Sequence, residues 1–237
     1  MPTGLVAILV LTAVELETRA LARALSLPPL PSLPFPAFGR GALRIAPVGI
    51  AACRLKDRWP ALLSTSDHPL VISAGVCGAL DPGLHVGDIV LCDSVIDGAG
   101  VRLSVTASAS QRAVAAGRAN APAGAMVSSS QVVATPEAKA ALRAETGGVA
   151  VDMESAAIVE AAAAHGCASM ILRGISDDAR ETLPEALIAL MDPDGRIRSG
   201  RLLALARPRV LAAALRLRRA SRHALGNVAG SLARLAA

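Results

Sequence analysis

The chain has almost no aromatic residues: one Trp, two Phe and no Tyr, or 1% of 237 residues. A site that holds a planar ligand by stacking it on an aromatic ring is therefore not expected. The hydrophobic fraction is nevertheless 53%, so the core must be built from Ala, Leu, Val and Ile. Trp59, Phe35 and Phe38 fall in expected loop or helix regions, and we interpret them as packing residues.

Cysteine is also scarce. Cys53, Cys77, Cys92 and Cys167 form no CxxC pair and have no His at metal spacing, so we expect neither disulfides nor a metal, in a reduced cytoplasmic setting. No apolar run reaches the roughly 20 residues that a membrane span needs. The run Leu5–Leu11 has no basic residue before it and acidic residues directly after it, which indicates a first strand and not a signal peptide.

Acidic residues are absent from the C-terminal part of the chain. From Gly195 onward there are ten arginines and no Asp or Glu; the whole chain carries +5, which leaves about −5 for residues 1–194. After Pro208 an amphipathic helix is expected, with an apolar stripe of Val210, Ala214, Leu217, Leu225, Val228, Leu232 and Leu235 and with Arg209, Arg216, Arg219 and Arg234 on the other side. We interpret it as a helix packed on the domain with a solvated basic face. Contact with a membrane surface is the open alternative, whereas nucleic acid is not expected without an aromatic platform or a known motif.

Apolar runs alternate with helical patterns over most of the chain, which predicts an α/β fold with helices on both faces of a sheet. The expected strands are residues 5–11, 43–48, 70–74, 88–96, 125–127, 149–153 and 169–175. The expected helices are residues 15–25, 51–64, 108–119, 136–145 and 154–165. The five prolines of Pro28–Pro36 predict a connecting loop. We assign residues 1–182 to a catalytic domain and residues 183–237 to an Arg-rich helical extension packed on it.

The most informative segments are VAVDMESAA at Val149–Ala157 and ILRGISDD at Ile171–Asp178. Each contains an apolar run that ends in carboxylates, and a helical pattern connects the two runs. In a parallel β-α-β unit both strands end at the same edge of the sheet, where open α/β folds place their ligands. Glu154 and Asp177 are therefore expected to face one crevice.

These segments, together with VISAGVCGALDPGLHVGDIV at residues 71–90, resemble the signature segments of the nucleoside phosphorylase and methylthioadenosine/S-adenosylhomocysteine nucleosidase superfamily. The resemblance extends from about Val6 to Asp178. The short chain and the Arg-rich tail with its Asp192–Gly195 turn most resemble the hopanoid-associated phosphorylase branch. The resemblance implies a three-layer αβα phosphorylase-like fold with a mixed central sheet, no cofactor and a homo-oligomer.

The activity that the resemblance implies is cleavage of the N-glycosidic bond of an adenine nucleoside, with release of adenine. The implied substrate is adenosylhopane, a lipid-linked nucleoside, which the basic helix would meet at the inner membrane face. Methylthioadenosine/S-adenosylhomocysteine or futalosine cleavage is the enzymatic alternative. A membrane-associated scaffold without activity is the alternative of a different class.

The resemblance assigns roles to three carboxylates. Asp177 would donate a proton toward N7 of the purine, Glu154 would accept hydrogen bonds from the ribose 2′- and 3′-hydroxyls, and Glu17, which ends the segment AVELE, would activate the attacking water. Each has a structural alternative, because Asp177 suits a helix N-cap, Glu154 gains from a helix dipole, and Glu17 fits a solvated first helical turn.

The remaining candidates would bind the sugar and the base. Met153 would pack against the sugar, or serve as an ordinary core methionine. Val132 and Val133, in the segment SSSQVV, match the place where the family holds the base with main-chain groups and apolar side chains. Ser176, beside the acid, completes this set.

The glycine-rich segment Gly75–Gly78 bears on the nucleophile. Phosphorylases of the family usually supply an Arg before this turn and a Ser or Thr within it, because phosphate needs charge and directed donors. Here Ser73 precedes the turn and Val76 lies within it. Hydrolysis is therefore favoured over phosphorolysis, while Gly75 and Val76 remain candidates for main-chain contacts and phosphate remains a possible co-substrate.

Overall fold

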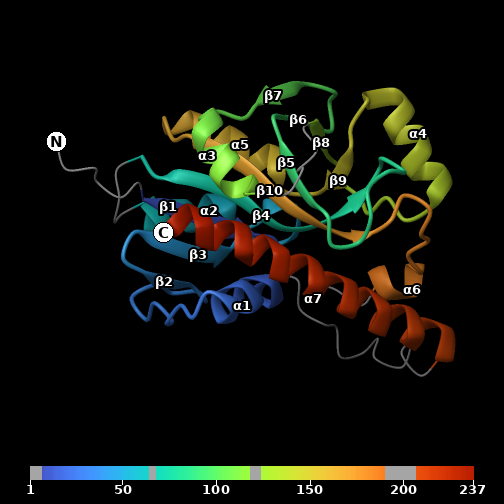
Figure 1. Cartoon of the computed structure of the whole chain (residues 1–237), viewed down its shortest axis with the longest axis horizontal. Helices are drawn as coiled ribbons and strands as arrows, with labels where there is room; N and C mark the ends of the chain where they lie inside the picture. Colours follow the sequence, from blue (N-terminus) through green and yellow to red (C-terminus); the bar gives the residue numbers. More distant parts are fainter. Residues whose placement is uncertain (1–6, 64–67, 118–123, 190–206) are drawn as a thin grey trace.

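The computed structural model describes residues 7–63, 68–117, 124–189 and 207–237, and shows a mixed ten-stranded sheet between two layers of helices (Figure 1). This is the α/β three-layer architecture that the sequence predicted. The strands are β1 (Ile8–Thr12), β2 (Phe38–Arg40), β3 (Leu43–Pro47), β4 (Leu70–Ala79), β5 (Ile89–Cys92), β6 (Ser94–Ile96), β7 (Arg102–Ser104), β8 (Ala125–Ser128), β9 (Ala150–Asp152) and β10 (Ser169–Asp177). The helices are α1 (Glu15–Ala24), α2 (Leu55–Leu63), α3 (Ala109–Ala116), α4 (Pro136–Thr146), α5 (Ser155–Ala164), α6 (Glu185–Ile188) and α7 (Pro208–Ala236), with a 3-10 turn, η1 (Ile50–Ala52).

The ten-residue strand β4 organises the sheet, whose main path runs β2-β3-β1-β4-β9-β8-β6-β7. It pairs in parallel with β1 and with β10, and β10 pairs in turn with the antiparallel β5. Because β4 and β10 stay together from Val71 to Gly78, groups at the ends of both strands lie close together.

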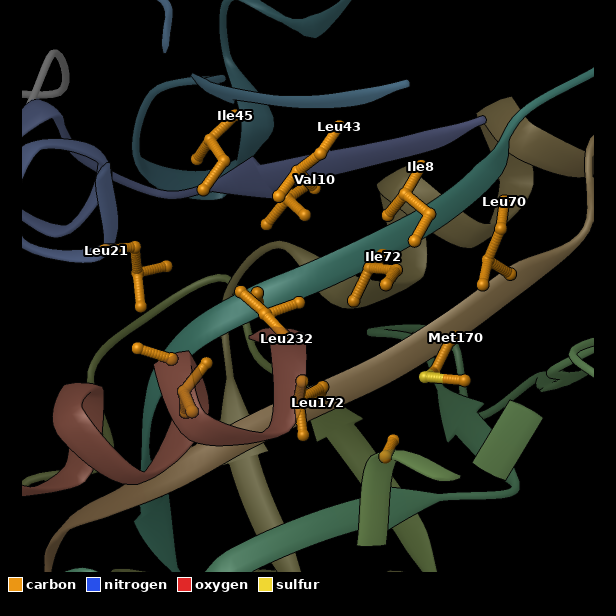
Figure 2. Close-up of a cluster of buried hydrophobic side chains, with 14 of the residues drawn as sticks. Ile8, Val10, Leu21, Leu43, Ile45, Leu70, Ile72, Met170, Leu172 and Leu232 are labelled. Carbon is orange, nitrogen blue, oxygen red and sulfur yellow. The ribbon is translucent and has the colours of Figure 1, made fainter. Parts of the chain in front are cut away.

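The two faces of the sheet carry separate cores because successive strand residues point to opposite sides. Ile8 and Val10 of β1 pack on the side of α1, α3 and α7, in the cluster drawn in Figure 2. Leu9 and Leu11 pack on the opposite side, against α2 and α5. There Trp59 of α2 is 4% exposed, and its ring centroid lies 5.2 Å from that of His165.

The C-terminal helix α7 lies on the same face of the sheet as α1 and α3. It packs on β4, β10, α1 and α3 (Figure 1). Val210, Leu225, Val228 and Leu232 are buried, as the helical spacing predicted. Helix α7 thus contributes to the core of the domain.

Two of the arginines expected on the solvated side of α7 are engaged. Arg234 donates from Nη2 to the carbonyl of Ala115 at 2.7 Å, at the end of α3, and Arg216 pairs with Glu181 at 2.6 Å. Arg209 and Arg219 are exposed as expected. The predicted turn at Asp192–Gly195 lies outside the described residues.

Several predicted boundaries shift. The expected strand 88–96 is two strands, β5 and β6, separated at Asp93, whose amide donates to Gly124 outside the β5 ladder. The expected helix 51–64 begins only at Leu55, since Ala51 and Ala52 have positive φ angles. Phe38, expected in a loop or helix, begins the short strand β2.

The expected parallel β-α-β unit is wrong. Strand β9 pairs antiparallel with Gly78 and Ala79 of β4, whereas β10 is parallel to β4, so β9 and β10 run in opposite directions. The long strand β4 pairs in parallel with β1 along its first residues and antiparallel with β9 along its last residues. An apolar run in the sequence does not show in which direction its strand will run. As a result Glu154 follows a strand that points back along β4, toward Gly75.

Candidate active site

A fully buried arginine occupies the centre of the site. Arg173 lies in the middle of β10, and its Nη2 donates to Ser73 Oγ at 2.9 Å and pairs with Asp152 at 2.8 Å and Glu154 at 3.4 Å. Burial lowers the pKa of Arg173, but the carboxylates of Asp152, Glu154 and Glu17 outweigh it and the net shift is upward. The guanidinium therefore stays charged and links Ser73 with the carboxylates around it.

Glu17 reaches this centre from the first turn of α1. Its side chain is buried, with Oε1 accepting from the amide of Val76 at 2.9 Å and Oε2 accepting from the amide of Ala13 at 3.1 Å. Burial raises the pKa of Glu17, and the Arg173 charge and the main-chain donors offset this only in part. Glu17 is therefore not the solvated helix residue of the structural alternative.

Glu154 lies at the N-cap of α5, directly after β9. Its Oε1 accepts from the amide of Ala51 at 3.0 Å, while Oε2 faces Arg173. Burial raises the pKa of Glu154 to about 7; Arg173 opposes the rise, and the negative charges of Asp152 and Glu17 add to it. This carboxyl is poised to change its protonation near neutral pH.

Asp177 ends β10, four residues beyond Arg173, and is also buried. Its Oδ2 accepts from Lys139 Nζ at 2.6 Å, and its Oδ1 accepts from Ser176 Oγ at 2.8 Å. The Ser176 hydroxyl lies, in addition, 3.2 Å from the carbonyl of Cys77. Asp177 thus pairs with a buried ammonium, and it is the N-cap of none of the helices in the described residues.

The glycines of β4 connect the two groups of charges. A side chain at Gly75, whose φ is +139°, would meet Glu17 Oε1 at 2.7 Å and Arg173 Nη1 at 2.8 Å. A side chain at Gly78 would meet Asp177 Oδ2 at 2.9 Å. Three residues of strand span about 10 Å, so the Glu17 and Asp177 carboxylates lie against the two ends of one short segment.

The remaining candidates lie at different depths. Met153 is half-buried between β9 and α5, and Val133 packs against the cluster of Leu80, Val127 and Val151. Val132 is 41% exposed. The roles of these three residues toward sugar and base stay predictions.

Sequence reasoning assigned no role to three buried groups. Arg173 stands inside an apolar run and resembles core strand, although a charged residue there was itself a signal that carboxylates lie nearby. Asp152, which accepts from Ser128 Oγ at 2.7 Å and from Ser155 Oγ, anchors Arg173. Lys139 in an alanine-rich helix gave no local signal.

Solved structures of other proteins share this fold. Futalosine hydrolase of Helicobacter pylori superposes with a TM-score of 0.68 at 18% identity, covering 98% of this chain and 97% of that chain. The 5′-methylthioadenosine/S-adenosylhomocysteine nucleosidase of Neisseria meningitidis, in complex with methylthio-immucillin-A, does so with a TM-score of 0.68 at 22% identity, covering 96% and 97%.

The sequence defines the family. The model of the phosphorylase superfamily matches residues 61–206. Futalosine hydrolase of Streptomyces coelicolor is 30% identical over 235 residues, which cover 80% of this chain and 94% of that protein. The chain belongs to the phosphorylase superfamily.

The described residues include no cluster of three or more His, Cys, Asp or Glu side chains able to hold a metal ion. Within the same ranges no helix is both long and apolar enough to cross a membrane.

Proposed function

We propose that this chain hydrolyses the N-glycosidic bond of an adenine nucleoside and releases adenine. The observation that carries the proposal is the placement of Glu17 and Glu154 around Arg173 at one end of the Gly75–Gly78 segment, with Asp177 at the other end. Cleavage of this bond passes through an oxocarbenium-like sugar. The site must therefore protonate the base, hold the ribose and deliver a nucleophile, and the three carboxylates are arranged to divide these tasks.

In the proposed reaction Asp177 gives its proton to N7 of the purine as the bond to the anomeric carbon breaks, so the base leaves neutral. Glu154 accepts hydrogen bonds from the ribose hydroxyls and holds the sugar beside Arg173. Glu17 accepts a proton from water as the water oxygen bonds to the anomeric carbon, and later returns that proton to solvent. Burial raises the pKa of Glu17 and so increases its strength as a base.

Water is the proposed nucleophile because Glu17 already occupies the position where an anion would bind. The amide of Val76, which an oxyanion would need, donates to Glu17 Oε1 at 2.9 Å. The hydroxyl of Ser73 accepts from Arg173, and the Arg173 charge is shared among three carboxylates. Addition of phosphate should leave the rate unchanged and give the 5-substituted ribose without phosphate; a phosphate-dependent rate with the 5-substituted ribose 1-phosphate as product would make the enzyme a phosphorylase.

Adenosylhopane is the proposed substrate, on the resemblance to the hopanoid-associated branch and on the surface of α7. Leu211 and Leu215 are 43% and 46% exposed on the outer side of this helix. At 100° per residue they share that side with three exposed arginines: Arg207, Arg218 and Arg222. Two leucines among arginines, on a helix without acidic residues, match the chemistry of an anionic bilayer surface.

The membrane contact is tested by co-sedimentation with phosphatidylglycerol-containing vesicles and with pure phosphatidylcholine vesicles. Arg218→Gln/Arg222→Gln should weaken binding to the anionic vesicles about 30-fold, since each lost charge costs about 1 kcal/mol near such a surface. Arg23→Gln/Lys56→Gln, which removes two exposed charges elsewhere, is the matched control. Equal binding of both double variants, or none by the wild type, would contradict the contact.

Substrate choice separates the enzymatic alternatives. The relative from Streptomyces coelicolor favours futalosine, and the structural neighbours include methylthioadenosine/S-adenosylhomocysteine nucleosidases. Purified protein is incubated in parallel with adenosylhopane, futalosine, methylthioadenosine and S-adenosylhomocysteine, and the released base is quantified by chromatography. A kcat/KM highest for a water-soluble nucleoside would remove the lipid-linked substrate.

Asp177→Asn tests the reaction itself. The amide cannot supply the proton, so kcat should fall about 100- to 10,000-fold. Asp178→Asn is the neighbouring control, because the Asp178 carboxylate accepts from the amide of Val86 and not from the site. Wild-type activity of Asp177→Asn would refute the role of the acid, and a wild-type protein inactive on every nucleoside would favour a membrane-associated scaffold.

The homo-oligomer implied by the resemblance is part of the proposal. Light scattering coupled to size exclusion measures it directly. A monomer with full activity would show that the pocket needs no neighbouring subunit.

A further inference from the structure

We propose that Lys139 is the positioning residue of the acid: it fixes the Asp177 carboxylate and compensates the charge that Asp177 acquires when it gives up its proton. The inference rests on the proposed role of Asp177. Lys139 reaches the end of β10 from α4, a helix that contributes no other residue to the proposed mechanism. Both side chains are buried, at 0% and 6% exposure, with Nζ 2.6 Å from Oδ2.

The contacts of Lys139 indicate that it acts through Asp177. An ammonium has three donors, and Nζ lies 2.6 Å from Asp177 Oδ2, 2.7 Å from the carbonyl of Asp178 and 3.3 Å from the carbonyl of Glu181. These acceptors use all three donors, so none is left for a substrate. The same three contacts tie the segment after β10 to α4.

The position of Lys139 costs folding free energy, which is unexpected for a residue with a purely structural role. It lies in the first turn of α4, whose N-cap Thr135 accepts from the amide of Ala138 at 3.2 Å. A cation is disfavoured by the dipole at that end of a helix, and a buried charge costs free energy unless it is paired. The Asp177 carboxylate pairs with the Lys139 ammonium, so the buried charge of Lys139 is compensated only when Asp177 is present.

The proton balance shows what the pair contributes. Before the reaction the Asp177 carboxyl holds one proton; transfer of this proton to N7 leaves a carboxylate, which Lys139 stabilises while remaining protonated itself. Lys139 therefore strengthens Asp177 as an acid. A neighbouring ammonium in general favours the ionised form of a carboxyl, so the pH dependence of the reaction is the readout that tests the role of Lys139.

Other charged and titratable groups surround the pair without duplicating it. Cys77 faces Asp177 from β4, and burial raises the pKa of its thiol. On the segment after β10, Asp178 Oδ1 accepts from the amide of Val86, and the Glu181 carboxylate pairs with Arg216 of α7. At the other end of the site lie Glu17 from α1, Asp152 at the end of β9, Glu154 before α5 and Arg173 in β10.

The experiment is the pH dependence of kcat and of kcat/KM for Lys139→Met, with the nucleoside that the wild type cleaves best. Without the ammonium Asp177 is the weaker acid, so kcat should fall about 100-fold at its acidic plateau. The alkaline limb should move to higher pH by about 1 to 3 units, the range that an adjacent opposite charge commands. Lys139→Arg, which restores a cation, should bring the limb back toward the wild-type position.

Arg143→Met is the matched control. It removes one positive charge from the same helix, one turn on, where Arg143 pairs with Asp81 at 2.9 Å near the surface. Its alkaline limb should coincide with that of the wild type. A wild-type limb in Lys139→Met, or an equal displacement in Arg143→Met, would overturn the inference.

A double variant separates this inference from the role of Asp177. In the Asp177→Asn background, Lys139→Met should change kcat no further, because the residue acts only through the lost carboxylate. Full activity of Asp177→Asn alone would refute the proposed acid, whereas an inactive Asp177→Asn with an unshifted Lys139→Met limb would refute only the inference. If Lys139→Met does not fold, recovery of the fold in Lys139→Met/Asp177→Asn supports the charge pairing, and failure to recover contradicts it.

Discussion

The two ends of the site differ in the balance between buried carboxylates and buried cations. Around Arg173, the carboxylates of Asp152, Glu154 and Glu17 share one guanidinium, so negative charge is in excess. Around Asp177, one carboxylate faces one ammonium. Burial raises the pKa of Glu17 and Glu154 in the first arrangement, so their ionised forms are the stronger proton and hydrogen-bond acceptors, which suits a base and an acceptor of ribose hydroxyls. The second compensates the charge that remains after a proton has been given away.

The largest effect that tests this comparison is expected from Glu17→Gln. The amide keeps the shape but accepts no proton from water, so kcat should fall about 100- to 10,000-fold in a steady-state assay of base release. Since the NH2 group of Gln replaces one of the two oxygens that accept from main-chain amides, a melting curve is recorded to show that the variant is folded. Glu15→Gln, which changes only the surface pair with Arg19, is the control. Equal activities of the two variants would remove Glu17 from the mechanism.

Removal of the shared cation should have the next largest effect. Arg173→Met leaves the carboxylates of Asp152, Glu154 and Glu17 buried without their counter-ion, and loss of one partner from a buried ionic cluster costs about 3 to 5 kcal/mol of unfolding free energy. Urea denaturation measures the loss. Arg19→Met, at an exposed pair, should change stability by less than about 1 kcal/mol. Similar stabilities of both variants would contradict the central role of Arg173.

The burial of Glu154, together with the excess negative charge around it, also predicts a pH-dependent stability. The pKa of Glu154 rises from 4.5 to about 7 on folding, so between these pH values the native state holds a proton that the unfolded chain releases. This contribution is complete below about pH 4.5 and is lost as pH rises through about 7, in total about 3 kcal/mol. Denaturation of wild type and Glu154→Gln at pH 5 and pH 8 compares them, and the wild type should lose more stability. A parallel response would remove the contribution of Glu154.

The smallest effect is expected away from both ends of the site. Arg234→Ala removes the donors to the carbonyls at the end of α3 and should cost about 1 kcal/mol of stability with kcat unchanged. Urea denaturation together with the activity assay checks this. A large loss of activity would show that the packing of α7 on α3 is coupled to the site. The difference between the two ends of the site would then depend on residues outside both ends.

Sequence patterns predicted elements with a strong period and missed what depends on strand direction. The stripe of α7 was predicted because Leu225, Val228 and Leu232 repeat at helical spacing. A strand end at Asp177 was predicted because polar residues close an apolar run, whereas the catalytic role of Asp177 came from the resemblance. The direction of β9 was predicted wrongly, since Ala150–Asp152 pairs with the far end of β4, a partner that local hydrophobicity does not specify.

The two buried cations of the site, Arg173 and Lys139, were the hardest residues to predict from the sequence. Arg173 is charged within an apolar strand, and its three acidic neighbours come from two segments of the chain: Glu17 from α1, and Asp152 and Glu154 from the junction of β9 and α5. Lys139 has the same local context as any exposed lysine of a helix, and only its distance to Asp177 distinguishes it. The resemblance supplied the three carboxylates without the cations that accompany them.

The single tryptophan provides an intrinsic fluorescent probe of the domain. Trp59 is buried in α2 beside His165, which follows α5, the helix that begins at Glu154. With no tyrosine in the chain, excitation in the near ultraviolet selects this one indole. Its emission wavelength and quenching then follow the seam between these two helices without any added dye, from the intact enzyme to the denatured chain.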